Sequence, residues 1–133
     1  MGALIDSSVL IAAERGTLDL DAVLKDYGNV DFAVSAITAS EIIHGVHRTK
    51  SAERRTRREA YVEALLSRFP VLPFDLIAAR AHSRLWAQLA AKGVAIGAHD
   101  LLIAATAIAK GLDLVTCDER GFSRIPGLSL IRW

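Results

Sequence analysis

Apolar residues in this chain fall into short runs, and the stretches between the runs have helical spacing. The first run, residues 3–5, ends at Asp6 and is followed by Ser7 and Ser8, which is the pattern of a buried strand that leads directly into a helix. Similar runs predict further strands at residues 30–36, 71–72, 112–116 and 128–132.

Six helices are predicted around these strands. In residues 51–68, for example, Ala60, Tyr61, Ala64 and Leu65 fall on one helical face and form an apolar stripe. The other predicted helices cover residues 7–14, 18–26, 38–50, 76–92 and 98–110. Because helices alternate with strands along the chain, we expect an α/β fold in which a parallel sheet of four or five strands is covered on both faces.

Composition predicts one aliphatic domain. The chain has no predicted linkers or repeats, so we expect a single domain over residues 1–133. Hydrophobic residues make up 52% of it and aromatic ones only 6%, a balance that suits aliphatic helices on a buried sheet and suggests that a partner covers part of the surface. The formal net charge is +1, so any affinity for nucleic acid has to come from a local patch.

The sequence predicts neither a membrane-spanning nor a secreted protein. Cys117 is the only cysteine, which excludes an intramolecular disulfide and fits a reducing compartment. No apolar run reaches the roughly 18 residues that a transmembrane helix needs, and the N-terminus lacks the basic start of a secretory signal. We therefore expect a cytoplasmic location and no association with membranes.

Four acidic residues are predicted at one edge of the sheet. Asp6 directly follows the first strand, and Glu41 lies early in the helix after the second. Asp100 opens the helix that leads into the strand at 112–116, and Asp118 comes shortly after that strand. In a parallel sheet the amino ends of the connecting helices lie at the same edge as the carboxyl ends of the strands, where such folds bind ligands. The topology therefore brings all four carboxylates to one rim.

A cluster of this kind is typical of a metal site. Two carboxylates about 4 Å apart repel each other by roughly 4 kcal/mol at an effective dielectric constant near 20, so a cluster persists when a cation neutralises it. Oxygen ligands without histidine or cysteine favour Mg²⁺ or Mn²⁺ over zinc. Such an ion polarises a phosphate and activates a water, which points to phosphodiester chemistry.

Each acid also has a simpler structural explanation. Asp6 could only cap the helix that follows it, and Glu41 could complete a capping box that begins at Thr38. Asp100 could be an acid favoured by a helix dipole, and Asp118 a turn residue. The simple explanations account for each residue alone, whereas the shared rim favours the metal site.

Four segments of the chain resemble sequence blocks of the PIN-domain family. They resemble in particular the VapC-type toxins, the ribonuclease halves of type II toxin–antitoxin pairs. The segments are residues 4–11 (LIDSSVLI), 38–46 (TASEIIHGV), 96–105 (IGAHDLLIAA) and 114–118 (LVTCD). They follow the order and spacing of the family and extend over essentially the whole chain.

The resemblance implies a fold, an activity and a set of site residues. The fold is a PIN-like three-layer α/β/α sandwich, and the activity is that of an endoribonuclease that uses Mg²⁺, for which Mn²⁺ can substitute. Asp6, Glu41, Asp100 and Asp118 would be the catalytic metal-binding acids, with Asp6 and Asp100 as principal ligands. The hydroxyls of Ser8 and Thr116 would support the site.

One position departs from the common family pattern. The family often has Asp before the Phe of the last block, where this chain has Gly121. The assignment of Asp118 is therefore weaker than that of the other three acids. Asp113 and Glu119 are alternatives to it, although both also fit solvated turn residues.

The resemblance further implies partners: an RNA substrate, a cognate antitoxin protein and a second copy of the chain in a homodimer. The principal alternative function is a catalytically inactive PIN-like module that binds protein or RNA without cleavage. The presence of all four acids argues against this alternative.

A basic cluster follows the second predicted strand and its helix. Residues 48–59 contain six basic side chains against Glu53 and Glu59. Contact with RNA phosphates is the functional interpretation, for which the candidates are Arg48, Arg54, Arg55 and Arg58. A solvated helix face and a contact with the antitoxin are equally compatible with the pattern. No aromatic residues are interleaved, so base recognition is not predicted. Trp86, elsewhere in the chain, is expected in the core or in an interface.

Overall fold

The computed structural model describes residues 2–133, and within that range five strands form one parallel sheet. The strand order is β3-β2-β1-β4-β5, with β1 at the centre. The strands are β1 (Gly2–Ile5), β2 (Asp31–Ser35), β3 (Val71–Leu72), β4 (Asp113–Thr116) and β5 (Leu130–Arg132). The predicted parallel sheet is confirmed.

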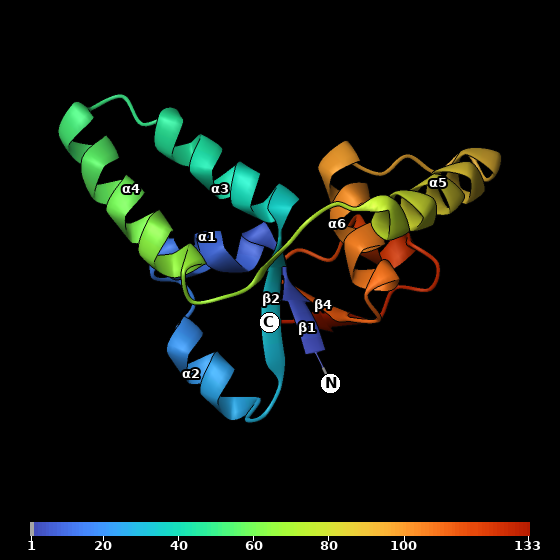
Figure 1. Ribbon diagram of the computed structural model, residues 1–133, viewed down its shortest axis with the longest axis horizontal. Helices are drawn as coiled ribbons and strands as arrows, with labels where there is room; N and C mark the ends of the chain where they lie inside the picture. Colours follow the sequence, from blue (N-terminus) through green and yellow to red (C-terminus); the bar gives the residue numbers. More distant parts are fainter. Residues whose placement is uncertain (1) are drawn as a thin grey trace.

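Helices cover both faces of this sheet (Figure 1). One layer is made of α1 (Ser7–Arg15), α2 (Leu20–Asp26), α3 (Ala36–His47) and α4 (Ala52–Leu66). The other is made of α5 (Leu76–Ala91) and α6 (Ala98–Ala109), with a short 3₁₀ turn at Phe122–Arg124. The arrangement is the predicted three-layer α/β/α sandwich. Among residues 2–133, no helix has both the length and the apolar composition needed to cross a bilayer.

The central strands contribute side chains to two separate cores, because successive side chains of a strand point to opposite faces of the sheet. Ala3 and Ile5 of β1 pack with Val9 and Leu10 of α1, in the core beneath α1 to α4. Leu4 packs into the other core, beneath α5 and α6. Burial on both faces explains why these strands appear in the sequence as continuous apolar runs.

The helix after β2 begins earlier than predicted, and this removes one alternative for Glu41. Ser35 is the N-cap of α3, and its hydroxyl accepts a hydrogen bond from the backbone N–H of Thr38 at 3.0 Å. Thr38 is therefore already inside the helix, and the capping box considered as an alternative role for Glu41 does not form. Glu41 lies in the second turn, so capping does not explain its position.

Candidate active site

Asp6 is held at the carboxyl end of β1 by two hydroxyl groups. The Oγ of Ser8 donates to Asp6 Oδ2 at 2.7 Å, and the Oγ1 of Thr116, at the end of β4, lies 3.0 Å from the same oxygen. Asp6 also caps α1, but the cap bond from the Ser8 N–H is long, at 3.4 Å. The carboxylate is only 4% exposed. Its two short contacts go to hydroxyls, so capping is a secondary role.

Asp100 lies in the electric field of the other three acids. It occupies the first turn of α6 and is partly buried. Burial raises the pKa of Asp100 above its ordinary value of 3.8, and the charges of Asp6, Glu41 and Asp118 raise it further, whereas His99 lowers it. The structure thus brings three of the predicted acids within electrostatic range of the fourth, Asp100.

Two glycines lie next to Asp100, and one of them allows an unusually close approach of the backbone. A Cβ at Gly121 would lie 3.2 Å from Asp100 Oδ2, and a Cβ at Gly97 would lie 3.6 Å from it. The first distance is tighter than ordinary van der Waals contact. Gly121, which departs from the common family pattern, therefore lets the segment after β4 approach this carboxylate.

Glu41 reaches the rim from α3 with one oxygen unpaired. Its Oε2 lies 3.6 Å from Nδ1 of His99 on α6. Its Oε1 is buried and has no hydrogen-bond partner among the described residues. A buried carboxylate oxygen without a partner carries a desolvation cost, so a cationic ligand here would be stabilised.

Asp118 is engaged by an arginine that the sequence patterns did not single out. Arg120 donates to it twice, from Nη2 to Oδ2 at 2.7 Å and from Nε to Oδ1 at 2.9 Å. These bonds lower the pKa of the exposed Asp118 carboxyl to about 2. The sequence feature that could have predicted this pair is the i, i+2 spacing of an acid and an arginine just after a strand.

Of the two alternatives to Asp118, one lies away from the rim and the other lies next to an arginine. Asp113 begins β4 and pairs in register with Ala3 near the start of β1, so it lies at the opposite edge of the sheet. Glu119 lies near the rim, but its carboxylate is 3.6 Å from Arg132. Asp113 is therefore excluded as a member of the rim.

The rim is hollowed beside three of the four acids. A hollow of about 480 Å³, here called the acidic hollow, is lined among others by Asp6, Ser8, Ile11, Asp100, Asp118 and Arg120. Glu41 instead lines an adjacent hollow of about 320 Å³, which Ile11 also lines. The four acids therefore share a rim across two neighbouring hollows.

The donor set fits a hard divalent cation. All four side chains offer carboxylate oxygens, and Mg²⁺ and Mn²⁺ prefer such ligands. Within residues 2–133, however, no three Asp, Glu, His or Cys side chains stand close enough together to hold one ion as they are. Asp118 points to Arg120 and Glu41 to His99, as repulsion between like charges favours. The chemistry of the set and the unpaired Oε1 of Glu41 fit a cation, and coordination requires rotation of these side chains.

Two of the predicted RNA-binding arginines have structural partners. Arg58 of α4 donates to both carboxylate oxygens of Glu14 at 2.8 and 3.0 Å and to the Gly45 carbonyl at 2.9 Å. Arg55 donates twice to the Thr49 carbonyl, at 2.8 and 3.1 Å. These contacts tie α4 to α1 and to the end of α3.

Arg48 and Arg54 are exposed, as the phosphate-binding interpretation requires. Arg48 lines the same hollow as Glu41, together with Arg15 at the end of α1. Sequence reasoning missed Arg15 because it lies far along the chain from the basic cluster.

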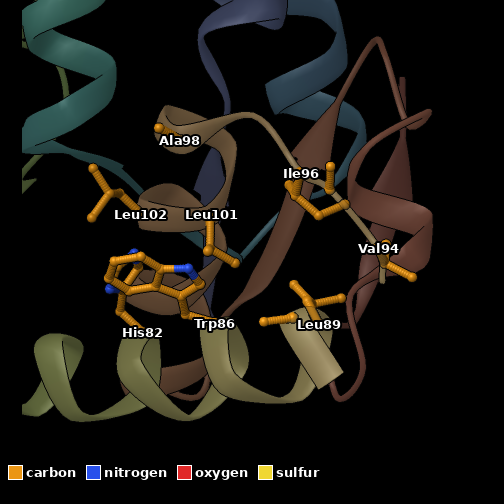
Figure 2. A pocket seen from close by; sticks show the side chains of 10 residues that line it. His82, Trp86, Leu89, Val94, Ile96, Ala98, Leu101 and Leu102 are labelled. Atoms are coloured by element: carbon orange, nitrogen blue, oxygen red, sulfur yellow. The ribbon is translucent and has the colours of Figure 1, made fainter. Parts of the chain in front are cut away.

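An apolar hollow of about 450 Å³ lies in the other layer, between α5 and α6. Figure 2 shows His82 and Trp86 of α5 facing Leu101 and Leu102 of α6. Trp86 is 63% exposed, so it is not a core residue. The other location predicted for Trp86, an interface with a partner, stays a prediction.

The sequence matches one protein-family model and several named proteins over most of its length. The model of the PIN domain matches residues 3–128. Ribonuclease VapC1 of Rickettsia felis is 36% identical over 131 residues, which cover 98% of this chain and 96% of that protein. The tRNA(fMet)-specific endonuclease VapC of Salmonella typhimurium is 39% identical over 100 residues, covering 75% and 74% of the two chains.

Solved structures agree with the sequence comparison. VapBC2 from Rickettsia felis, bound to a DNA fragment from its promoter, matches with a TM-score of 0.88 at 30% identity and covers 100% of this chain and 99% of the matched one. DNA-bound VapBC from Salmonella typhimurium matches with the same TM-score and identity, over 100% and 98% of the two chains. The four sequence blocks, the sheet order and these matches together show that the chain belongs to the PIN-domain family and, within it, to the VapC ribonucleases.

Proposed function

We propose that this protein is the toxin of a type II toxin–antitoxin pair and hydrolyses RNA phosphodiester bonds with the help of Mg²⁺ or Mn²⁺. The observation that carries the proposal is the position of Asp100, whose pKa is raised by burial and by Asp6, Glu41 and Asp118. Four carboxylates from separate parts of the chain lie along the edge at which parallel α/β sheets bind ligands. Membership in the VapC ribonucleases supports the same activity.

Asp6 and Asp100 are proposed as the principal metal ligands, with Glu41 and Asp118 completing the set. A divalent cation held there supplies Lewis-acid polarisation of the phosphate and lowers the pKa of a water. Ser8 and Thr116 orient Asp6 by holding its Oδ2, which keeps this carboxylate in one rotamer. Arg120 holds Asp118 by a bidentate pair and must release it before Asp118 can turn toward Asp100.

The proposed partners are an RNA, an antitoxin protein and a second copy of the chain. The antitoxin is supported by the VapBC complexes among the similar structures. The homodimer is supported by the surface of α5, which carries the three most exposed large apolar side chains among the described residues, Leu76, Ile77 and Trp86. A cytoplasmic location belongs to the same proposal, because the RNA and the antitoxin would be met there.

The decisive experiment is cleavage of cellular RNA by the purified protein. We expect cleavage with Mg²⁺ or Mn²⁺, its loss in excess chelator, and its return when metal is restored. Asp100→Asn should abolish cleavage without changing the circular dichroism spectrum. Asp113→Asn is the matched control, because Asp113 is an acid of the same sheet at the opposite edge, and it should cleave normally.

Two outcomes would contradict this proposal. Undiminished cleavage in chelator would exclude the metal mechanism. RNA binding without turnover under every metal condition would favour the alternative function, a catalytically inactive binding module.

A further inference from the structure

We propose that the hollow beside Glu41 binds a backbone phosphate of the RNA near the cleavage site, and that Arg15 and Arg48 hold it. This hollow, here called the arginine hollow, has a volume of about 320 Å³ and is lined among others by Ile11, Arg15, Glu41, Arg48 and Arg58. The inference rests on the proposed ribonuclease function and assigns part of its substrate-binding surface.

The arginine hollow contains two positive charges that no acid neutralises. Arg58 is paired with Glu14, with Nε and Nη2 each donating to one carboxylate oxygen. Arg15 and Arg48 are exposed, and within residues 2–133 neither side chain makes a hydrogen bond or an ion pair. The two arginines share this hollow with one carboxylate, that of Glu41, which is itself a proposed metal ligand.

The arginine hollow and the acidic hollow both border α1 and share Ile11 in their lining. Asp6 caps the start of this helix, Ile11 in its middle lines both hollows, and Arg15 is its last residue. Nine residues at a rise of about 1.5 Å each make α1 about 14 Å long. Arg15 thus lies a helix length away from Asp6, and the arginine hollow, which contains Glu41 but not Asp6 or Asp100, would receive a neighbouring phosphate rather than the scissile one.

The electrostatics of the rim favour such a contact. Four carboxylates repel an approaching phosphate, and the net charge of +1 provides no general attraction for RNA. A metal ion at the acids would attract the scissile phosphate, but attraction for the neighbouring phosphates has to come from cations beside the rim. Guanidinium groups suit phosphate because they donate two parallel hydrogen bonds. Arg15 and Arg48 are placed to provide it.

Each arginine also has a simpler explanation. Arg15 ends α1 and Arg48 caps α3, and a cation at a helix C-terminus is favoured by the dipole. That effect acts on each helix separately. It does not explain why two helix ends bring their arginines to one hollow next to the catalytic acids.

The test uses RNA in which single phosphates are made neutral. Once the cleavage position is mapped, oligoribonucleotides across it are synthesised with one methylphosphonate linkage each, next to a 2′-O-methyl ribose. The control oligonucleotide has the 2′-O-methyl ribose and a normal phosphate. For the wild type we expect one linkage, other than the scissile one, at which neutralisation lowers kcat/KM by roughly ten- to a hundredfold, the range for a charged hydrogen bond.

The variants then assign that linkage to the arginines. In Arg15→Gln with Arg48→Gln, the same methylphosphonate should have little further effect, because the side chains that bind this phosphate are already absent. KM should rise while kcat stays near the wild-type value, as for a contact made equally in ground and transition states. The logarithmic salt dependence should also flatten by about 0.7 for each phosphate that the variant no longer binds. Lys25→Gln removes one positive charge from α2, and Lys25 lines neither hollow, so this control should change none of these.

The outcomes separate this inference from the proposed function. If the wild type cleaves RNA but the double variant keeps the full methylphosphonate effect, the inference is overturned and the ribonuclease proposal stands. Normal cleavage with weakened antitoxin binding would also overturn it and assign the arginines to the protein partner. If the wild type does not cleave at all, the ribonuclease proposal fails. Binding of the wild type and of the double variant to one oligoribonucleotide, with a methylphosphonate placed at each linkage in turn, then still decides whether the hollow binds phosphate.

Discussion

Arg120 holds the carboxylate of Asp118 by two hydrogen bonds, of 2.7 Å from Nη2 to Oδ2 and of 2.9 Å from Nε to Oδ1. The pair lies at the surface, with 90% and 48% of the two side chains exposed. Arg120 also lines the acidic hollow together with Asp6 and Asp100. A cation that uses Asp118 therefore competes with this guanidinium.

We predict that Arg120→Gln increases the affinity for Mn²⁺ several-fold in a calorimetric titration. Without Arg120, Asp118 is free to turn toward Asp100, and its pKa returns from about 2 toward the ordinary 3.8. Arg124→Gln is the control, because Arg124 donates to the carbonyl of Ala95 and not to an acid. An equal increase in Mn²⁺ affinity in both variants would show that the effect comes only from the general change in net charge.

We predict that Asp100→Asn raises the melting temperature of the metal-free protein at neutral pH. The pKa of Asp100 is raised in the folded state, so the folded protein binds more protons than the unfolded chain between the unfolded and folded pKa values. Stability therefore falls as pH rises through this window, and the penalty persists at neutral pH. The asparagine variant lacks this penalty, and its advantage should disappear below the ordinary pKa of 3.8.

The same melts with metal distinguish a cation site from a simple helix-start acid. Added Mg²⁺ should stabilise the wild type by mass action and the variant less. A variant that melts below the wild type without metal, and gains as much from Mg²⁺, would contradict the shared site.

We predict that Gly45→Ala fails to stabilise the protein, although alanine is favoured over glycine inside a helix by about 1 kcal/mol. A Cβ at this position of α3 would lie 3.0 Å from Nη2 of Arg58 and 3.3 Å from its Cζ. The guanidinium has to shift, which weakens its bonds to Glu14 and to the carbonyl of residue 45. In an Arg58→Gln background the full gain of about 1 kcal/mol should appear in denaturant unfolding. Identical effects in both backgrounds would show that Arg58 adapts without cost.

We predict that Trp86→Gln weakens self-association without lowering the melting temperature of the monomer. Trp86 is 63% exposed, so its removal leaves the core intact, whereas a homodimer that covers α5 would be deprived of a large apolar side chain in its interface. Sedimentation at tens of micromolar measures the effect. Tyr61→Gln, a change to a 39% exposed aromatic residue on α4, should leave association unchanged. A wild-type protein that is monomeric at these concentrations would contradict the homodimer.

The sequence by itself determined the order of the elements and the edge at which the acids gather. Apolar runs and helical spacing are local properties of the chain, and alternation of strands and helices forces a parallel sheet with one ligand-binding edge. The position of Asp6 and Asp100 at this edge follows from the topology alone. Asp6 directly follows a strand, and Asp100 lies in the first turn of a helix. Asp113 could have been excluded in the same way, since it stands at the beginning of its strand.

Only the tertiary structure decided what each polar side chain contacts. Arg58 was a candidate for phosphate binding until its partner Glu14, 44 residues away in the sequence, was placed beside it. Arg15 became a candidate only when the end of α1 was brought to the hollow that Arg48 lines. The pattern of apolar residues predicts the course of the backbone because burying apolar area is favourable whichever apolar neighbour covers it. Hydrogen bonds and ion pairs depend on distances of a few ångströms between particular atoms, and those distances exist only once the helices have packed.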